Sequence, residues 1–107
     1  MLVSLDPSIG SEMRKTRPAL IVNADALGKL PLKIIAPITE WKERFAAYPW
    51  MVKVMPSKQN GLAKESAVDC FQIRSVSVQR LTDAIGFVQP EVIVQVRKAI
   101  RLVLGDG

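Results

Sequence analysis

Residues 90–105, PEVIVQVRKAIRLVLG, are the one segment of this sequence with a clear helical period. Pro90 stands where the first residue of a helix belongs, Glu91 falls in the first turn, and Gly105 stands where the chain leaves the helix. Apolar residues recur along it at helical spacing: Ile93, Val96, Ile100, Val103 and Leu104. The pattern predicts a single amphipathic helix at the carboxyl end, so the remaining residues must build the rest of the core without another long helix.

The sequence before this helix is divided into short apolar runs by Pro, Gly and charged residues. We expect strands at 1–5, in PALIVNAD from Pro18, at 32–39, 50–56 and 66–76, and at the end of VQRLTDAIGFV. Many short strands with Pro and Gly turns, followed by one packed helix, predict a mainly β fold (α+β). The expected architecture is a small SH3-like twisted β-barrel with a C-terminal α-helix, in a single domain over residues 1–107.

Three local features refine this prediction. Pro37 near the end of its strand indicates an edge strand or a bulge. Residues 66–76 form either one long bent strand or two short ones, and a regular strand puts Asp69 on the face opposite Gln72, unless a bulge near Phe71 intervenes. The aromatic side chains either stack on single-stranded bases or, as we expect for most of them, pack in the core or at a subunit interface.

Charge and composition restrict the chemistry. Fifteen Lys and Arg against ten Asp and Glu give a net charge of +5, which favours anionic partners such as nucleic acid or acidic proteins. With no histidine and one cysteine, the chain has neither a disulfide, nor the ligands of a zinc site, nor a base for a serine or cysteine nucleophile. We expect no metal and no cofactor. No leader-like start or membrane-spanning run is present, so a cytoplasmic location is expected.

The basic residues, and arginine in particular, are therefore the remaining candidates for a functional site. The stretch GSEMRKTRPALIV places Arg14, Lys15 and Arg17 around Glu12, in a loop that leads directly into a strand. Arg17 is the strongest candidate, because Pro18 holds it in extended backbone at the start of a rigid element. A guanidinium suits a phosphodiester and the extra charge of its transition state. A solvated arginine at a strand start has the same pattern, and Arg14 and Lys15 are more simply explained as loop charges.

Three other residues are candidates with equally simple alternatives. Thr39 ends an apolar strand, where its hydroxyl either faces a cleft or merely closes the strand. Gln72 can read a nucleobase through its amide, or is a polar residue on a wet strand face. Glu12 is a general base, an acceptor for a base edge, or an ordinary loop acid.

The segment LDPSIGSEMRKTRPALIVNAD closely resembles the first signature of the MazF/PemK family of toxin endoribonucleases. APIT, GLAKESAV, QIRSV and QRL follow in the family's order and spacing, so the resemblance covers nearly the whole chain. It implies the CcdB/PemK-like toxin fold, acting as a symmetric homodimer. It also implies metal-independent, sequence-specific cleavage of single-stranded RNA, leaving a 2′,3′-cyclic phosphate and a 5′-hydroxyl. The partner implied is a MazE-like antitoxin whose acidic, disordered tail covers the cleft.

By this resemblance, Arg17 matches the family's catalytic arginine before proline, and Thr39 matches the threonine at the end of its IT strand. Arg17 would stabilise the phosphorane, Thr39 would hydrogen-bond the scissile phosphate, and Glu12 is our choice of general base. Ser11 and Gln72 match positions that contact bases or ribose. The residues that we assign to RNA binding are Ser11, Arg14, Lys15, Lys58 and Gln72.

The chain departs from the family pattern at two places. Family members usually begin with a few more residues, whereas Met1 here falls inside the first strand. Some members also place an acid directly before the glutamine, where this chain has Phe71, and some use a histidine. Two alternatives to the nuclease therefore stay open: a CcdB-like toxin that binds gyrase without nuclease activity, and an inactive truncated relative. The combination of Arg17 and Thr39 favours the nuclease.

Overall fold

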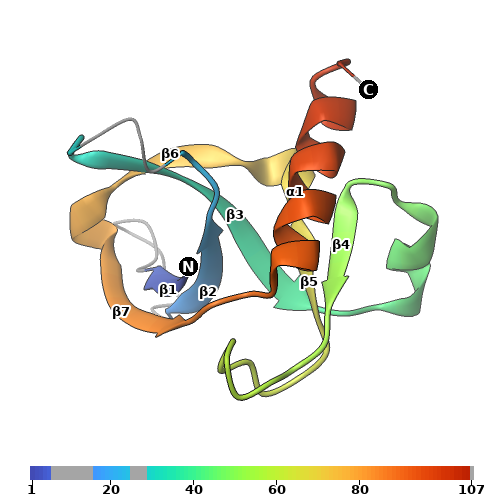
Figure 1. Cartoon of the computed structure of the whole chain (residues 1–107), viewed down its shortest axis with the longest axis horizontal. Helices are drawn as coiled ribbons and strands as arrows, with labels where there is room; N and C mark the ends of the chain where they lie inside the picture. Colours follow the sequence, from blue (N-terminus) through green and yellow to red (C-terminus); the bar gives the residue numbers. More distant parts are fainter. Residues whose placement is uncertain (6–15, 25–28, 107) are drawn as a thin grey trace.

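The computed structural model describes residues 1–5, 16–24 and 29–106. In chain order the strands are β1 (Leu2–Leu5), β2 (Arg17–Ile21), β3 (Leu32–Glu40), β4 (Met51–Val54), β5 (Ser66–Asp69), β6 (Arg74–Ser77) and β7 (Leu81–Gly86), followed by helix α1 (Pro90–Val103). Short 3-10 turns lie between them: η2 (Glu43–Ala47), η3 (Cys70–Gln72) and η4 (Val78–Arg80). Figure 1 shows the strongly curled sheet with α1 lying across one side of it.

Every strand pairing is antiparallel, and the strands follow the order β4-β5-β3-β2-β1-β7, with β6 also pairing β3. The mainly β fold with a C-terminal helix is therefore confirmed. The path through the described strands remains open, since β4 and β7 end it and no pairing joins them. The term barrel thus describes the curl of this sheet and not a closed ring.

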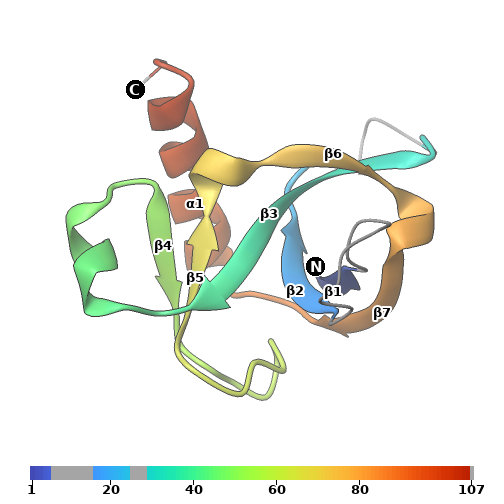
Figure 2. The same ribbon diagram turned by 180° about the vertical axis from the view of Figure 1, so that it is seen from behind.

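β3 is the central strand, and this overturns the possibility that Pro37 marks an edge. β2 pairs along one side of β3, while β6 and β5 follow one another along the other side, as Figure 2 shows. The β6 pairing ends at Ile35 and the β5 pairing begins at Ile38. Pro37 lies in this gap, where the missing N–H of proline leaves no partner on that side unsatisfied.

The gap in the pairing of β3 faces η3, which separates β5 from β6. Residues 66–76 are thus two short strands, one of the two forms that the sequence allows. The alternation expected for a regular strand is broken there, because the 3-10 turn brings Asp69 and Gln72 together. The strand is not regular here, so the placement on opposite faces does not apply, and the interruption falls near Phe71, where the sequence allowed a bulge.

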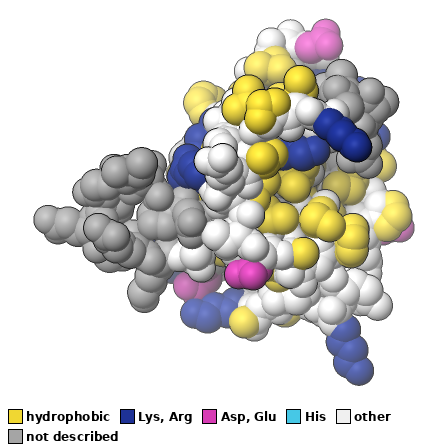
Figure 3. Space-filling model, turned by 90° about the vertical axis from the view of Figure 1, so that its left-hand side faces the viewer, with side chains coloured by type: hydrophobic (Ala, Val, Ile, Leu, Met, Phe, Trp, Pro, Cys, Tyr) yellow, Lys and Arg dark blue, Asp and Glu magenta, His cyan; other side chains and the backbone are white. Residues whose placement is uncertain are grey.

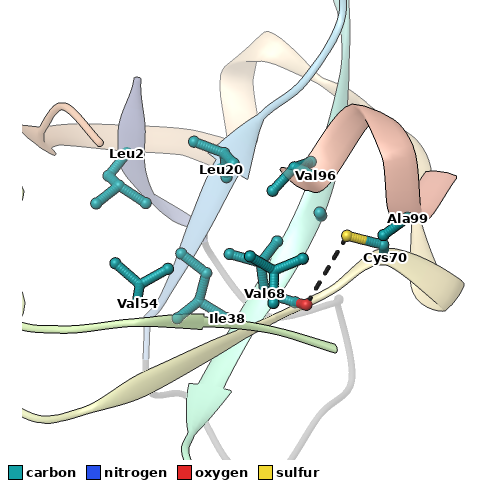
Figure 4. Close-up of a cluster of buried hydrophobic side chains, with 10 residues drawn as sticks. Leu2, Leu20, Ile38, Val54, Val68, Cys70, Val96 and Ala99 are labelled. Atoms are coloured by element: carbon teal, nitrogen blue, oxygen red, sulfur yellow. Dashed lines mark hydrogen bonds between the residues drawn. The ribbon is translucent and has the colours of Figure 1, made fainter. Parts of the chain in front are cut away.

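The sheet is buried on both faces, because β3 contributes alternate residues to two separate cores. The face that packs against α1, which we call the helix face, carries a core that includes Leu2, Leu20, Ile38, Val68, Val96 and Ala99 (Figure 4). The opposite face, which we call the distal face, carries a smaller core of Leu5, Ala19, Ile35 and Val76. Ile35 and its neighbour Ala36 thus point into different cores.

Helix α1 has the boundaries that its sequence predicts. Pro90 is its first residue, and Gly105 follows its end with a φ of 81°, a left-handed conformation that glycine adopts without strain. Val96 and Ala99 are its buried residues, and α1 packs against β4 and η3. The expected apolar face is correct except at Leu104, whose side chain is 70% exposed. Within the described part of the chain, no helix is long and apolar enough to cross a membrane.

The turn SKQNG is held by a buried asparagine. The Asn60 side chain accepts hydrogen bonds from the backbone N–H groups of Ser57 (3.0 Å) and Leu62 (2.9 Å), and it donates one to the carbonyl of Met55 (2.8 Å). Gly86 of β7 packs against this turn so closely that a Cβ there would lie 2.2 Å from the Gln59 carbonyl oxygen. These contacts fix the path of the chain that leads from the turn to β5.

Candidate active site

The register of β2 and β3 brings Arg17 and Thr39 together. Arg17 opens β2 and Thr39 is the last residue but one of β3. Ala19 of β2 lies opposite Pro37 of β3, and Arg17 and Thr39 lie two residues beyond this pair in their strands. Both residues line one pocket, so they lie close together at this end of the sheet. Both are exposed, which leaves a guanidinium and a hydroxyl open to solvent at the end of a rigid pair of strands.

A pocket of about 400 Å³ opens beside this pair. Its lining comes from the start of β2, the end of β3 and the segment that leads into β5. The residues that give it its chemical character are Arg17, Thr39, Glu40, Lys42, Leu62 and Lys64. We refer to it as the Arg17–Thr39 pocket.

The charge balance of this pocket is positive. Glu40 lies 4.0 Å from the ammonium groups of both Lys42 and Lys64, so one carboxylate is shared by two lysines. All three side chains are at least half exposed, and exposed ion pairs of this kind contribute little to stability. No carboxylate of the described residues forms an ion pair with Arg17. Among the described residues that line the pocket, three cations stand against one carboxylate, a balance that favours binding of an anion.

The other described candidates lie outside this pocket. Gln72 is exposed on η3, and its amide nitrogen donates a hydrogen bond of 2.9 Å to the carboxylate of Asp69. Lys58 is exposed in the SKQNG turn. Four further candidates, Ser11, Glu12, Arg14 and Lys15, lie outside the described residues. The structure therefore brings together two of the predicted site residues, Arg17 and Thr39.

Sequence reasoning missed the lysines of the pocket. Lys64 lies in GLAKESAV, a segment that the sequence analysis identified without assigning a role to any residue in it. Lys42 stands three residues after Thr39, and the chain turns there from β3 into η2. Its position just after the strand end that carries the Thr39 hydroxyl is the sequence signal that could have assigned Lys42 to the site.

Five of the six aromatic side chains, all except Phe87, form a continuous row instead of a set of separate stacking platforms. The ring of Trp41 meets the edge of Phe45, and Tyr48 stacks on Trp50 with centroids 4.9 Å apart. Phe45 also contacts Tyr48, and Trp50 meets Phe71. Phe45 is buried, whereas the Phe71 side chain at the other end of the row is 60% exposed. Within this row Phe45 is the one ring in the core, so the expectation that most aromatic side chains lie in the core or at a subunit interface stays a prediction for the others.

Cys70 is a packing residue. It is fully buried in the core of the helix face, and its thiol contacts the carbonyl oxygen of Val68 (Figure 4). Burial, together with the nearby negative charge of Asp69, raises the pKa of the Cys70 thiol to about 12. A thiol with that pKa is neutral at physiological pH, so it is a poor nucleophile.

The arrangement of Arg17 and Thr39 suits the stabilisation of negative charge. A guanidinium presents several donors in a plane, and the hydroxyl adds another, so two non-bridging oxygens of a phosphate can be bound at once. Lys42 and Lys64 would contact neighbouring phosphates as point charges. Fold and site together define a small β-sheet protein with an anion-attracting pocket at one end of its central strand.

The comparisons identify the family. Residues 1–104 match the family model described as "PemK-like, MazF-like toxin of type II toxin-antitoxin system". The chain is 33% identical over 101 residues to Endoribonuclease EndoA of Bacillus subtilis, covering 94% of this chain and 85% of that protein. The chain therefore belongs to the PemK-like and MazF-like toxin family.

Solved structures of similar fold agree with this assignment. A MazE-MazF crystal structure from Deinococcus radiodurans matches with a TM-score of 0.77 and 26% identity, covering 99% of this chain and 93% of that chain. The toxin MazF-mt6 of Mycobacterium tuberculosis has the same fold, with a TM-score of 0.78 and 23% identity over 97% of this chain and 95% of that chain. The toxin fold expected from the sequence is thus confirmed.

Proposed function

We propose that this chain is the toxin of a toxin-antitoxin pair and acts as an endoribonuclease on single-stranded RNA. The observation that carries the proposal is that Arg17 and Thr39 line one pocket together with Lys42 and Lys64. The relatives support it, because proteins that the chain matches over most of its length are named endoribonucleases. Nothing in their names favours a gyrase-binding toxin.

In the proposed reaction the ribose 2′-hydroxyl attacks the adjacent phosphorus. The bond from phosphorus to the 5′-oxygen of the next nucleotide breaks, so the products are a 2′,3′-cyclic phosphate and a 5′-hydroxyl. A proton leaves the 2′-oxygen, and a proton is delivered to the departing 5′-oxygen. The protein supplies no nucleophile, and its task is to stabilise the charge that builds on the phosphorane.

Arg17 and Thr39 have distinct roles in this proposal. The guanidinium of Arg17 stabilises the developing charge, which is a role that suits a planar cation with several hydrogen-bond donors. The hydroxyl of Thr39 donates a hydrogen bond to a phosphate oxygen and orients it. Glu12 remains our candidate for the general base.

We further propose that the chain acts in the cytoplasm as a homodimer and is inhibited by an acidic antitoxin tail. Figure 3 shows hydrophobic side chains gathered on the side of the molecule that carries the start of β3 together with β6 and β7. Leu32, Ile34 and Val78 are among the exposed hydrophobic residues of these elements and of η4. A second copy would cover such a surface. The positive pocket suits an acidic segment, and the Deinococcus radiodurans relative was solved as a MazE-MazF complex.

The test is cleavage of a long RNA by the purified protein in excess EDTA, with Arg17→Ala beside it. We expect fragments with 5′-hydroxyl ends, and a loss of on the order of 10² to 10³ in rate for the variant. Arg101→Ala is the matched control, because Arg101 is an exposed arginine on the last turn of α1. Equal cleavage by all three proteins, or intact RNA together with inhibited gyrase, would contradict the proposal.

A further inference from the structure

Asp69 holds two parts of η3 at once. One oxygen of its carboxylate, Oδ1, accepts a hydrogen bond of 3.1 Å from the backbone N–H of Phe71. The other, Oδ2, accepts one of 2.9 Å from Nε2 of the Gln72 side chain. The first bond caps the 3-10 turn, and the second ties down the end of a side chain that is otherwise exposed to solvent.

The second hydrogen bond fixes which way the Gln72 amide points. A carboxylate only accepts hydrogen bonds, so it is the NH₂ group of Gln72 that must face Asp69. The amide oxygen Oε1 therefore points away from Asp69 and toward solvent. A free glutamine can present either its donor or its acceptor to a ligand, whereas Gln72 presents its oxygen first.

The corner formed by Asp69 and Gln72 lies close to the Arg17–Thr39 pocket. Thr39 lies opposite Ala67, and Asp69 is two residues further along β5 on the same face of the sheet. Neighbouring strands are about 5 Å apart and each residue advances the strand by about 3.3 Å, so the Cα atoms of Thr39 and Asp69 are roughly 8 Å apart. Thr39 and the Asp69 carboxylate both belong to the distal face. A single-stranded RNA held at Thr39 thus passes the Gln72 amide within a nucleotide or two.

Phe71 offers a flat surface beside the amide. Its ring is 60% exposed, and its orientation is set by Trp50, whose ring it meets edge to face with centroids 5.6 Å apart. Its backbone is fixed by the Asp69 cap. An exposed aromatic ring on a fixed turn is a suitable stacking surface for an unpaired base.

We propose that Asp69 is a positioning residue for base recognition: it orients Gln72 so that the amide oxygen selects a base with an amino group at C6 of a purine or C4 of a pyrimidine, that is adenine or cytosine, near the cleavage site. Guanine and uracil carry a carbonyl oxygen at the corresponding place, and that oxygen would face Oε1 of Gln72 without a proton between them. Stacking on Phe71 contributes affinity without selecting among bases. This inference rests on the proposed function and names the specificity of the same site.

The decisive variant is Asp69→Asn. Asparagine caps a turn as well as aspartate does, so the hydrogen bond to Phe71 is kept. The new side chain amide, however, both donates and accepts, and Gln72 is then free to turn over. A purely structural role for Asp69 would alter the overall rate and leave the base preference unchanged.

The experiment is cleavage of an RNA library randomised around the cut, with sequencing of the products from the parent protein and from Asp69→Asn. For the parent we expect one position near the cut at which adenine or cytosine is preferred by on the order of tenfold, and we expect that preference to fall to about twofold in the variant. Ser77→Ala is the control, because Ser77 caps η4 by the same kind of bond to Gln79 and lies away from Gln72.

A second measurement keeps the inference testable if Asp69→Asn cleaves poorly. Both tryptophans, Trp41 and Trp50, belong to the aromatic row that ends at Phe71, so intrinsic fluorescence reports binding of oligonucleotides that carry a 2′-deoxy group at the cut. Replacing adenine by purine at the selected position should weaken binding to the parent several-fold and leave binding to Asp69→Asn unchanged. An identical base profile for the parent and the variant would overturn this inference alone, whereas absence of cleavage by the parent would overturn the proposed function.

Discussion

The carboxylate of Glu40, at the end of β3, lies 4.0 Å from the ammonium of Lys64, in the segment that leads into β5. Lys42 lies at the same distance from the same carboxylate oxygen. The acid thereby holds two lysines on one side of the Arg17–Thr39 pocket. These ion pairs are solvent-exposed, so their consequence is expected in RNA binding more than in stability.

Removing both lysines should weaken RNA binding and its salt dependence together. For the double variant Lys42→Ala/Lys64→Ala we expect KM to rise several-fold with kcat little changed, because the role proposed for these lysines is to contact phosphates beside the one that is cleaved. For every phosphate that is no longer neutralised, the slope of log K against log salt concentration should fall by about 0.7 for a single strand. The measurement is a salt titration of RNA binding, with Lys98→Ala on α1 as the control. A double variant with the parent's slope would show that these lysines do not contact phosphate.

Thr39→Val tests the hydroxyl separately from the shape of the side chain. Valine keeps the β-branched outline that suits a strand end, so the free energy of unfolding should change by less than about 1 kcal/mol. Loss of one donor to the phosphate should lower kcat by roughly tenfold or more. Steady-state cleavage of a short RNA, together with urea denaturation, distinguishes the two effects. A Thr39→Val variant with full kcat would remove Thr39 from the catalytic pair.

The thiol of Cys70 should be unreactive in the folded protein. Its pKa is raised to about 12 by burial first and by the charge of Asp69 second. At pH 8 we expect iodoacetamide to modify it far more slowly in buffer than in concentrated urea, as followed by mass spectrometry. Rapid modification of the native protein would contradict the packing of this residue.

The raised pKa of the Cys70 thiol also makes the free energy of unfolding depend on pH. The unfolded thiol ionises near its ordinary pKa of 9.0 and the folded thiol only near 12, so between these values the folded state holds more protons. The stabilising effect of the neutral thiol is therefore fully present below pH 9 and is lost as the pH rises toward 12. Urea denaturation of the parent and of Cys70→Ala from pH 8 to 11 should show a steeper decline for the parent.

Much of this fold follows from sequence periodicity because each element has a local signal. α1 begins at Pro90, and Gly105 takes the positive φ just beyond it, as the helix pattern predicts. β4 alternates Val52 and Val54 inward with Met51 and Lys53 outward, as its sequence indicates. These features depend on residues a few positions apart, and propensity and burial act there in the same direction.

Features that depend on distant pairing could not be predicted in this way. Pro37 indicated an edge strand or a bulge, and it occupies the central strand at a point where η3 interrupts the pairing on one side. The hydrogen bond between Asp69 and Gln72 likewise exists because a 3-10 turn replaces regular strand. In the site, Arg17 and Thr39 were found from the sequence, whereas Lys42 and Lys64 were not, since only the fold brings their segments to one pocket.

Asn60→Ala should destabilise the whole domain and also impair the site. The substitution leaves the N–H groups of Ser57 and Leu62 and the carbonyl of Met55 without their hydrogen-bond partner. Asn60 itself is only 4% exposed, so water has little access to replace it. We expect a loss of about 2 to 4 kcal/mol in the free energy of unfolding, because buried polar groups without partners are costly. Leu62 and Lys64 line the Arg17–Thr39 pocket, so cleavage should fall even where the variant remains folded. Urea denaturation and cleavage assays at low temperature measure the two effects, with Gln59→Ala, an exposed residue of the same turn, as the control. If Asn60→Ala proved as stable as Gln59→Ala, the asparagine would not be the residue that holds this turn against the sheet.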